Sequence, residues 1–130
     1  MGNNWKITDT LTKVFAEEAP DGQGSIRLST LHRETVSCVI AYFGAADWGR
    51  YWKVSVKAPE KIETRLRRVE LVPSAYPCHK EQDDNYLRIV PGMYPDLLRD
   101  LDTEDDGADK KYLTKEVPGQ WRSLWLDVTV

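Results

Sequence analysis

Residues 119–130 read Gly119-Gln120-Trp121-Arg122-Ser123-Leu124-Trp125-Leu126-Asp127-Val128-Thr129-Val130. From Leu124 onward, leucine or valine occupies every second position, and Trp125, Asp127 and Thr129 stand between them. Successive side chains of a β-strand point to opposite faces, so this alternation predicts a half-buried strand with one apolar and one mixed face. Because the pattern runs to the last residue, we expect the chain to be an excised piece of a longer protein.

The first half of the chain predicts three further strands. Ser25–Leu31 alternates and follows the turn cluster Pro20–Gly24, so we expect it to form a hairpin with Thr35–Phe43. Thr35–Phe43 is almost continuously apolar or small, which is typical of a strand covered on both faces. Tyr51–Ala58 alternates cleanly and places Trp52 on its apolar face, in the core.

Four shorter or mixed stretches also predict strands. Leu11–Phe15 fits either one helical turn or a strand, and its short length favours the strand. Lys61–Val72 begins with helical spacing and continues with period two, so we expect mostly strand, with a β-bulge near Arg67-Arg68. Trp5–Ile7 and Asn85–Val90 are short apolar pieces. The stretches predicted as loops are Gly44–Arg50, Pro73–Asp84 and the acidic residues 100–109.

Together these stretches predict about eight short strands, with no long amphipathic helix and no internal repeat. Consecutive strands without helical crossovers pair mainly antiparallel. The sequence therefore predicts an all-β fold with little helix, an antiparallel β-sandwich of the jelly-roll or immunoglobulin-like type. With 130 residues, the chain is long enough for one domain with a core of its own, spanning residues 1–130.

The composition excludes several classes of function. Hydrophobic residues make up 41% of the chain, and no apolar run approaches the roughly 18 residues of a membrane span. The net charge is −3 with no basic stripe, so nucleic-acid binding lacks its usual electrostatic footprint. No Gly-rich phosphate loop is present, and we expect no cofactor. The chain starts without a signal-peptide pattern, so we expect a cytoplasmic protein if Met1 is the native start and a secreted one if a leader was removed.

The two cysteines are too few for a disulfide framework and lack the CxxC spacing of a metal or redox site. Cys38 lies in the apolar run Thr35–Phe43, where a small buried thiol is the simplest interpretation. Cys78 lies beside His79 in a proline-rich loop. No third residue orients that pair, so the sequence does not favour catalysis there.

Adjacent acidic residues are the remaining candidates for chemistry: Glu17-Glu18, Asp83-Asp84 and Asp105-Asp106. Glycosidases use two carboxyl groups roughly 5–9.5 Å apart, one of them in a setting that raises its pKa. These pairs lie in polar, turn-like surroundings, so we interpret them as solvated. The acidic loop 100–109 resembles the start of a calcium loop, but Leu113 stands where an EF-hand has its final Glu. We therefore expect a surface loop there and no metal site.

Three motifs match one family. Tyr94-Pro95-Asp96-Leu97 precedes the acidic connection, Gly119-Gln120-x-x-x-Leu124-Trp125 opens the last strand, and His32-Arg33-Glu34 precedes the apolar run. With this order of strands, the chain from about Leu11 to Val130 resembles the N-terminal β-sandwich of glycoside hydrolase family 123 and of the related bacterial proteins called domain of unknown function 4091. The chain has Leu97 where that family usually has a second proline.

The resemblance implies a non-catalytic, N-terminal domain of a bacterial glycoside hydrolase. In that family a catalytic (β/α)8 barrel follows the sandwich in the same polypeptide, carries the catalytic Asp-Glu pair and acts on N-acetylhexosamine glycans. A barrel needs about 250 residues, which 130 residues cannot provide. We therefore expect this chain to have no enzyme activity by itself and to have the C-terminal barrel as its partner. Two alternatives stay open, a free-standing carbohydrate-binding module and a general protein-interaction domain.

Aromatic residues supply most candidates for a glycan or interface site, because flat rings stack on sugar C–H surfaces and large aromatics concentrate at domain interfaces. Tyr94 and Asp96 belong to the Tyr-Pro-Asp motif, which we interpret first as a structural corner and alternatively as a contact with the barrel. The candidate carbohydrate-binding or domain-interface residues are Trp48, Tyr51, Tyr94, Asp96, Trp121 and Trp125. We expect no catalytic residue in this chain.

Overall fold

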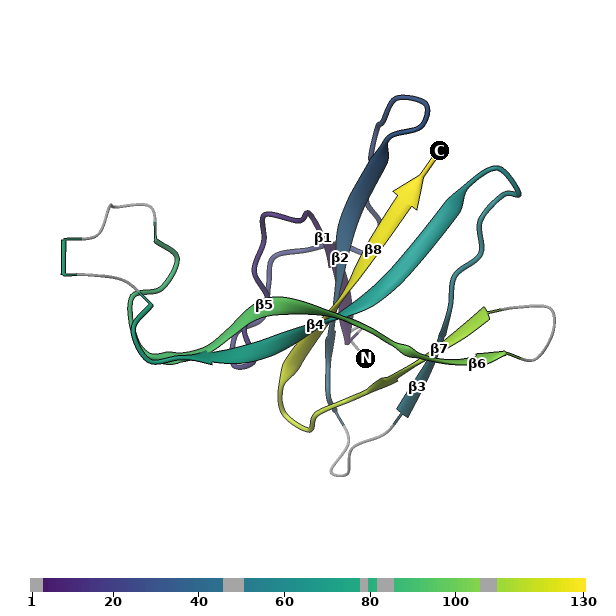
Figure 1. Cartoon of the computed structure of the whole chain (residues 1–130). Helices are drawn as coiled ribbons and strands as arrows, with labels where there is room; N and C mark the ends of the chain where they lie inside the picture. Colours follow the sequence, from purple (N-terminus) through teal and green to yellow (C-terminus); the bar gives the residue numbers. More distant parts are fainter. Residues whose placement is uncertain (1–3, 46–50, 78–79, 82–85, 106–109) are drawn as a thin grey trace.

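The computed structural model describes residues 4–45, 51–77, 80–81, 86–105 and 110–130, and these residues form eight β-strands and no helix. A five-stranded sheet has the order β1-β2-β8-β4-β5, and a three-stranded sheet has the order β3-β7-β6, with every neighbouring pair antiparallel (Figure 1). The strands are β1 (Trp5–Thr8), β2 (Thr35–Phe43), β3 (Tyr51–Ser55), β4 (Glu63–Ser74), β5 (Gly92–Asp100), β6 (Asp102–Asp105), β7 (Lys110–Lys115) and β8 (Trp121–Thr129). This confirms the predicted all-β, antiparallel sandwich. No helix among the described residues is long and apolar enough to cross a membrane.

Strand β8 lies in the middle of the larger sheet, between β2 and β4. Its predicted alternation is confirmed. Leu124 and Leu126 point into the main core, whereas Trp125 packs in a second apolar cluster on the other side of the sheet. The larger sheet therefore buries apolar side chains on both of its faces.

The main core lies between the two sheets. Tyr42 from β2, Leu66 from β4 and Leu124 from β8 meet Tyr112 from β7. Trp52 from β3 packs against this cluster, with its ring centroid 5.0 Å from that of Tyr42. The prediction that Trp52 belongs to the core is confirmed.

The opposite face of the five-stranded sheet, here called the outer face, is covered in part by the segment after β1. Val14 from this segment packs on Val39 and Ala41. The predicted strand at Leu11–Phe15 is wrong, because the Asp9 carboxylate accepts hydrogen bonds from the backbone N–H groups of Leu11 and Thr12 at 3.1 and 3.0 Å. A side chain that satisfies backbone donors in this way favours a turn over a strand.

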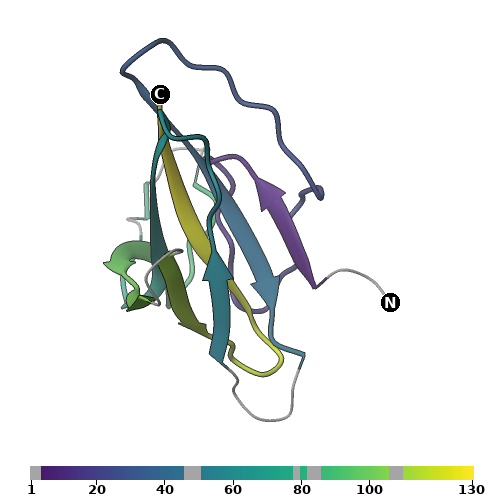
Figure 2. The same ribbon diagram turned by 90° about the vertical axis from the view of Figure 1, so that its right-hand side faces the viewer.

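The predicted hairpin of Ser25–Leu31 with Thr35–Phe43 is also wrong. Strand β8 pairs with one edge of β2 along its whole length, and β1 occupies the other edge at Val39–Tyr42, so β1 and not Ser25–Leu31 is the second partner of β2. Ser25–Leu31 instead forms an irregular strap that stands away from the sheet (Figure 2). The backbone of Gln23 pairs with Ile7 before the strap, and the N–H of Arg33 donates to the carbonyl of Val130 after it.

Strands β4 and β5 form a long hairpin whose end projects as an arm from the body of the sandwich (Figure 1). The β-bulge predicted near Arg67-Arg68 is misplaced: the register shifts between Glu70 and Leu71, and the extra residue belongs to β5. The predicted strand Asn85–Val90 is wrong. The residues described there, 86–90, form bends, and the strand begins at Gly92.

The acidic stretch is the other difference from the sequence prediction. Asp100 ends β5, and Asp102–Asp105 forms β6 rather than a loop. Leu101 is buried in the main core between these two strands, so it anchors the chain where it passes from the larger sheet to the smaller one. Strand β7, the partner of β6, was not predicted. Residues 106–109 of the predicted loop lie outside the described residues.

Candidate functional site

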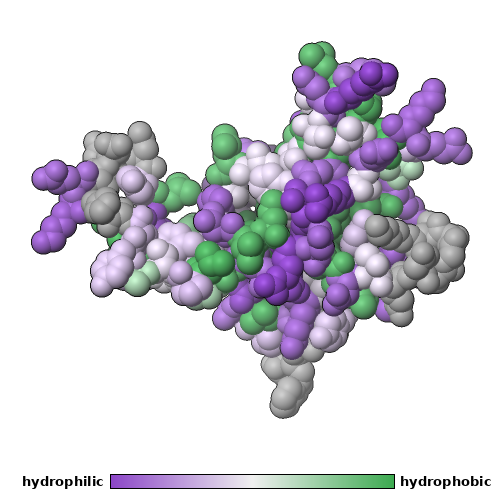
Figure 3. All heavy atoms as spheres, in the orientation of Figure 1, coloured by the Kyte–Doolittle hydropathy of each residue, from purple (hydrophilic) through white to green (hydrophobic). Residues whose placement is uncertain are grey.

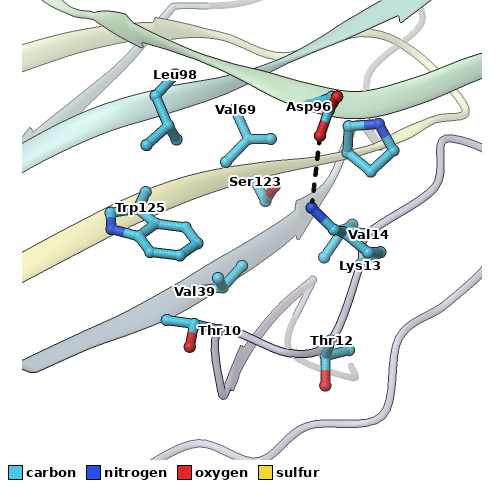
Figure 4. A pocket seen from close by; sticks show the side chains of 11 residues that line it. Thr10, Thr12, Lys13, Val14, Val39, Val69, Asp96, Leu98, Ser123 and Trp125 are labelled. Carbon is cyan, nitrogen blue, oxygen red and sulfur yellow. Dashed lines mark ion pairs between the residues drawn. The ribbon is translucent and has the colours of Figure 1, made fainter.

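A small hollow lies on the outer face, between the sheet and the segment after β1. Its volume is about 220 Å³, and Figure 4 shows the side chains around it. The lining residues come from that segment and from β2, β4, β5 and β8: Thr10, Thr12, Lys13, Val14, Val39, Val69, Pro95, Asp96, Leu98, Ser123 and Trp125. Most of the sheet residues in this set are apolar, whereas the segment contributes two hydroxyl groups and an ammonium group. We call this cavity the Trp125 hollow.

The β-bulge accounts for two adjacent residues of β5, Pro95 and Asp96, lining the Trp125 hollow together. Pro95 pairs with Leu71 and Leu97 with Glu70, so Asp96 is the extra residue of β5. In a regular strand, neighbouring side chains point to opposite faces, but a bulge breaks this alternation. Pro95 and Asp96 therefore both line the hollow. Pro95 is tolerated because β5 is an edge strand and the bulge leaves ladder positions unpaired.

The Trp125 ring is held by hydrogen bonds behind it. Its indole Nε1–H donates to Asp127 Oδ1 at 2.8 Å. The same carboxylate accepts from Ser37 Oγ at 2.5 Å and from Arg67 Nη2 at 2.6 Å. The Asp127 and Arg67 side chains are only 16% and 20% exposed. These contacts fix the plane of the indole ring relative to the sheet.

The pKa of Asp127 lies below its ordinary value. Burial acts in the opposite direction and raises it, but the hydrogen bonds from Ser37, Trp125 and Arg67, together with the positive charge of Arg67, outweigh burial. Asp127 therefore stays ionised at neutral pH and keeps its role as an acceptor for the indole N–H.

An ion pair stands at the rim of the hollow, across from Trp125 (Figure 4). Lys13 Nζ and Asp96 Oδ1 are 3.8 Å apart, and their side chains are 44% and 74% exposed. Exposed ion pairs at this distance stabilise a fold by only about 0–1 kcal/mol. Breaking the contact between Lys13 and Asp96 therefore costs little free energy, so a polar ligand can bind to both side chains in its place.

A second groove continues from the Trp125 hollow along β5, and the two share Lys13, Pro95 and Asp96. Tyr94 lines this groove and packs edge-on against Phe15, with ring centroids 5.8 Å apart. The remaining residues that line it are Phe15, Val72, Ser74, Pro77, Tyr86, Leu87 and Arg88.

Arg88 closes one side of the second groove. Its guanidinium lies 3.5 Å from the centroid of Phe15 and binds both Glu17 and Glu18. The hydrogen bond from Arg88 lowers the pKa of Glu17. Glu17 therefore remains an ionised partner of Arg88 and is not placed to act as a proton donor.

The structure brings some of the predicted site residues together and separates others. Trp125 and Asp96 line the same hollow, and Tyr94 lines the adjoining groove. Tyr94 and Asp96 lie inside β5, so the prediction of a structural corner is wrong. The Tyr-Pro-Asp motif is accommodated in a strand because the bulge gives β5 an extra residue.

Trp121 does not line the hollow, but it packs in the same second apolar cluster as Trp125. Trp121 packs against Phe43, with ring centroids 5.4 Å apart, and the Lys6 ammonium lies 5.7 Å from its ring centre. Tyr51 is exposed at the start of β3, on the smaller sheet. Trp48 falls outside the described residues.

Sequence reasoning missed the contribution of Thr10, Thr12 and Lys13. A local signal was present, because an aspartate followed by threonines is typical of a turn closed by the aspartate side chain. That signal predicts the turn, but not that the turn folds back over the outer face. Such a return depends on tertiary packing of Val14 against Val39.

The remaining candidates for chemistry are the two cysteines and the adjacent acidic residues. Cys38 is a buried free thiol, and burial raises its pKa. Cys78, His79 and Asp83-Asp84 lie outside the described residues, and so do the side chains of Asp105-Asp106. Within the described part of the chain, no group of three His, Cys, Asp or Glu residues is close enough together to hold a metal ion.

No protein-family model matches this chain, and no curated protein matches it either.

Proposed function

We propose that this chain is a non-catalytic β-sandwich domain that supports the catalytic (β/α)8 barrel of a glycoside hydrolase acting on N-acetylhexosamine glycans. The similarity of its Tyr94-Pro95-Asp96-Leu97 and Gly119-Gln120-x-x-x-Leu124-Trp125 motifs to glycoside hydrolase family 123 suggests the barrel as the partner. The role of the sandwich is to hold the barrel through a docking surface, while the carboxyl groups that break the glycosidic bond belong to the barrel.

The observation that carries this proposal is the exposed apolar surface at the arm. Large apolar side chains that face solvent gather in the connection from β4 to β5 and in β5 itself: Tyr76, Tyr86, Leu87, Ile89, Val90, Met93 and Leu97. Figure 3 shows hydrophobic side chains on the face over β5. Exposed large apolar side chains of this kind are typical of a surface that another protein domain covers.

The anchoring of the arm supports a docking role. Arg88 ties the exposed run to the body of the sandwich through Glu17, Glu18 and the ring of Phe15. A surface that is held in place before binding loses less conformational freedom when it binds. The arm is therefore suited to receive a rigid partner such as a barrel.

The test uses the reading frame that encodes this chain. If it continues into a barrel, the barrel is produced separately and its association with the present chain is measured by calorimetry. Leu87→Ser should weaken the association by about tenfold, as expected for a buried leucine at an interface. Leu31→Ser is the matched control, because Leu31 and Leu87 are both 70% exposed, and Leu31 lies in the strap.

Two results would contradict the proposal. One is a reading frame that encodes no barrel. The other is an association that Leu87→Ser and Leu31→Ser leave equally unchanged. Hydrolysis of a chromogenic N-acetylhexosaminide by this chain alone would contradict the assignment of a non-catalytic role.

A further inference from the structure

We propose that the Trp125 hollow is a binding site for one neutral sugar ring. This inference concerns the outer face of the sandwich and does not depend on the docking of a barrel at the arm.

The hollow has the amphipathic character of a sugar ring. Val39, Val69 and Leu98 make one part of its wall apolar, and Trp125 adds a flat aromatic surface. Lys13 and Asp96 place a hydrogen-bond donor and a charged acceptor on the opposite side (Figure 4). A hexopyranose presents C–H groups on the faces of its ring and hydroxyl groups around its edge. Its faces match the apolar wall, and its hydroxyl groups match the rim.

The size of the hollow limits the ligand. Sites for drug-sized molecules measure about 300–1,000 Å³. At about 220 Å³, the Trp125 hollow accommodates one ring rather than a chain of sugars buried along its length. The adjoining groove, lined by Tyr94 and Arg88, offers space for a substituent or for the next residue of a glycan.

The charges at the rim favour a neutral ligand. Lys13 and Asp96 carry opposite charges and face each other at 3.8 Å, so together they add no net charge to the site. A neutral polyol replaces this weak contact with two charge-assisted hydrogen bonds, one from Lys13 and one to Asp96. An anionic or cationic ligand gains one of these partners and is repelled by the other.

The aromatic wall is fixed before binding. Trp125 donates its indole N–H to Asp127, and Asp127 is itself held by Ser37 and Arg67. A ring that already occupies its binding orientation loses little freedom when the ligand arrives. The hydrogen bonds of Asp127 therefore hold the Trp125 ring in place on this partly open face of the sheet. A mobile ring would bind the sugar more weakly.

The experiment is a titration of the whole chain with methyl glycosides of glucose, galactose, mannose and N-acetylglucosamine. Binding is detected by two-dimensional NMR of the tryptophan indole N–H groups. The indole signal that disappears from the spectrum of Trp125→Phe is assigned to Trp125. At least one glycoside should shift this signal saturably in the millimolar range, as expected for so small a ligand.

Asp96→Ala should weaken the binding by about fivefold or more, because a charged hydrogen bond to the ligand is lost. Asp100→Ala is the matched control. Asp96 and Asp100 lie on the same strand, are 74% and 77% exposed and both bind a basic side chain, but Asp100 does not line the hollow. Asp100→Ala should bind the sugar as the unmodified chain does.

The proposal fails if no glycoside gives a saturable shift, or if Asp96→Ala and the unmodified chain respond equally. It also fails if N-acetyl-leucine amide binds and the sugars do not, since the hollow would then belong to a peptide side chain. Because the chain is titrated alone, none of these results depends on whether a barrel docks at the arm.

Discussion

The hydroxyl oxygens of Tyr42 and Thr114 lie 2.9 Å apart and join the two sheets of the sandwich at their most buried point. Tyr42 comes from β2 and Thr114 from β7, 72 residues later in the chain. Each residue is also less exposed than the apolar side chains around it, apart from Ala41. Burial raises the pKa of Tyr42, so its hydroxyl remains protonated and able to donate at physiological pH.

We predict that this pair contributes measurably to the free energy of unfolding. Tyr42→Phe and Thr114→Val should each destabilise the protein by about 1–3 kcal/mol, because each leaves a buried hydroxyl with fewer partners. The double variant should lose less than the sum of the two, with a coupling of about 1 kcal/mol in urea denaturation.

The control for this cycle is a hydroxyl pair on the surface. Thr35 and Thr129 also form a side-chain hydrogen bond, at 2.7 Å, but it is exposed to water. Thr35→Val and Thr129→Val should show a coupling close to zero, since water replaces the lost partner. Equal coupling energies in the two cycles would show that burial does not strengthen the Tyr42–Thr114 contact.

A second prediction concerns Gly44, where the chain leaves β2. Its N–H donates to the Gln120 carbonyl at 3.0 Å, and its own carbonyl accepts from Gly119 at 2.7 Å. A Cβ atom at position 44 would overlap the carbonyl group of Val117. Gly44→Ala should therefore lower the free energy of unfolding by about 1–3 kcal/mol, the usual range for an overpacked site. Gly92→Ala is the control, because a Cβ there meets nothing within 4 Å.

The elements predicted correctly are those whose own pattern decides their structure. β2 and β8 are nine residues long, and their apolar residues stand at the positions expected for a strand that lies inside a sheet. β7 was missed because its buried side chains include the polar Thr114 beside Tyr112, so its inward face does not stand out as apolar. Ser25–Leu31 shows the opposite error. It has the alternation of a strand, but the strands that pair with β2 are β1 and β8, and alternation within a segment does not say which partner it meets.

The candidate site could be predicted only in part, for the same reason. Trp125 was identified because it lies on the non-core face of a strand whose alternation is clear. Asp96 was identified from a motif, although the bulge that makes it an extra residue of β5 was predicted in the stretch Lys61–Val72 instead. Lys13 and Thr10 could not be assigned to the site, because they reach it only when the turn after Asp9 folds back over the sheet.

A third prediction concerns the Cys38 thiol. It is buried in β2, and burial raises its pKa, so little thiolate forms at neutral pH. In a Cys78→Ser background, alkylation of Cys38 by iodoacetamide should be about 100-fold slower in the folded protein than in urea, since reaction requires opening of the sheet. Mass spectrometry of timed samples gives both rates. Similar rates in the two conditions would contradict the buried position of the thiol.

The last prediction uses the lowered pKa of Asp127. A carboxyl group with a lower pKa in the folded state than in the unfolded state stabilises the fold above its unfolded pKa, and this contribution is lost as the pH falls through the folded value. Asp127→Asn should therefore lower the free energy of unfolding by about 1.5–3 kcal/mol at pH 7, the range for hydrogen bonds to a charged group. The difference from the unmodified protein should shrink below about pH 4, where the Asp127 carboxyl of the unfolded chain begins to accept a proton while that of the folded protein stays ionised.

Asp100→Asn separates this effect from a general response to lost charge. Asp100 also binds an arginine, Arg65, at 3.0 Å, but both side chains are exposed. Water screens that pair, so its loss should change the free energy of unfolding little at either pH. Urea denaturation of the unmodified protein and of both variants at pH 7 and near pH 3 gives the change in the free energy of unfolding for each variant at each pH. Because Asp127 also holds the indole N–H of Trp125, only Asp127→Asn should shift the Trp125 indole signal. A pH-independent loss in Asp127→Asn would mean that the ionised carboxylate is not what holds the network together.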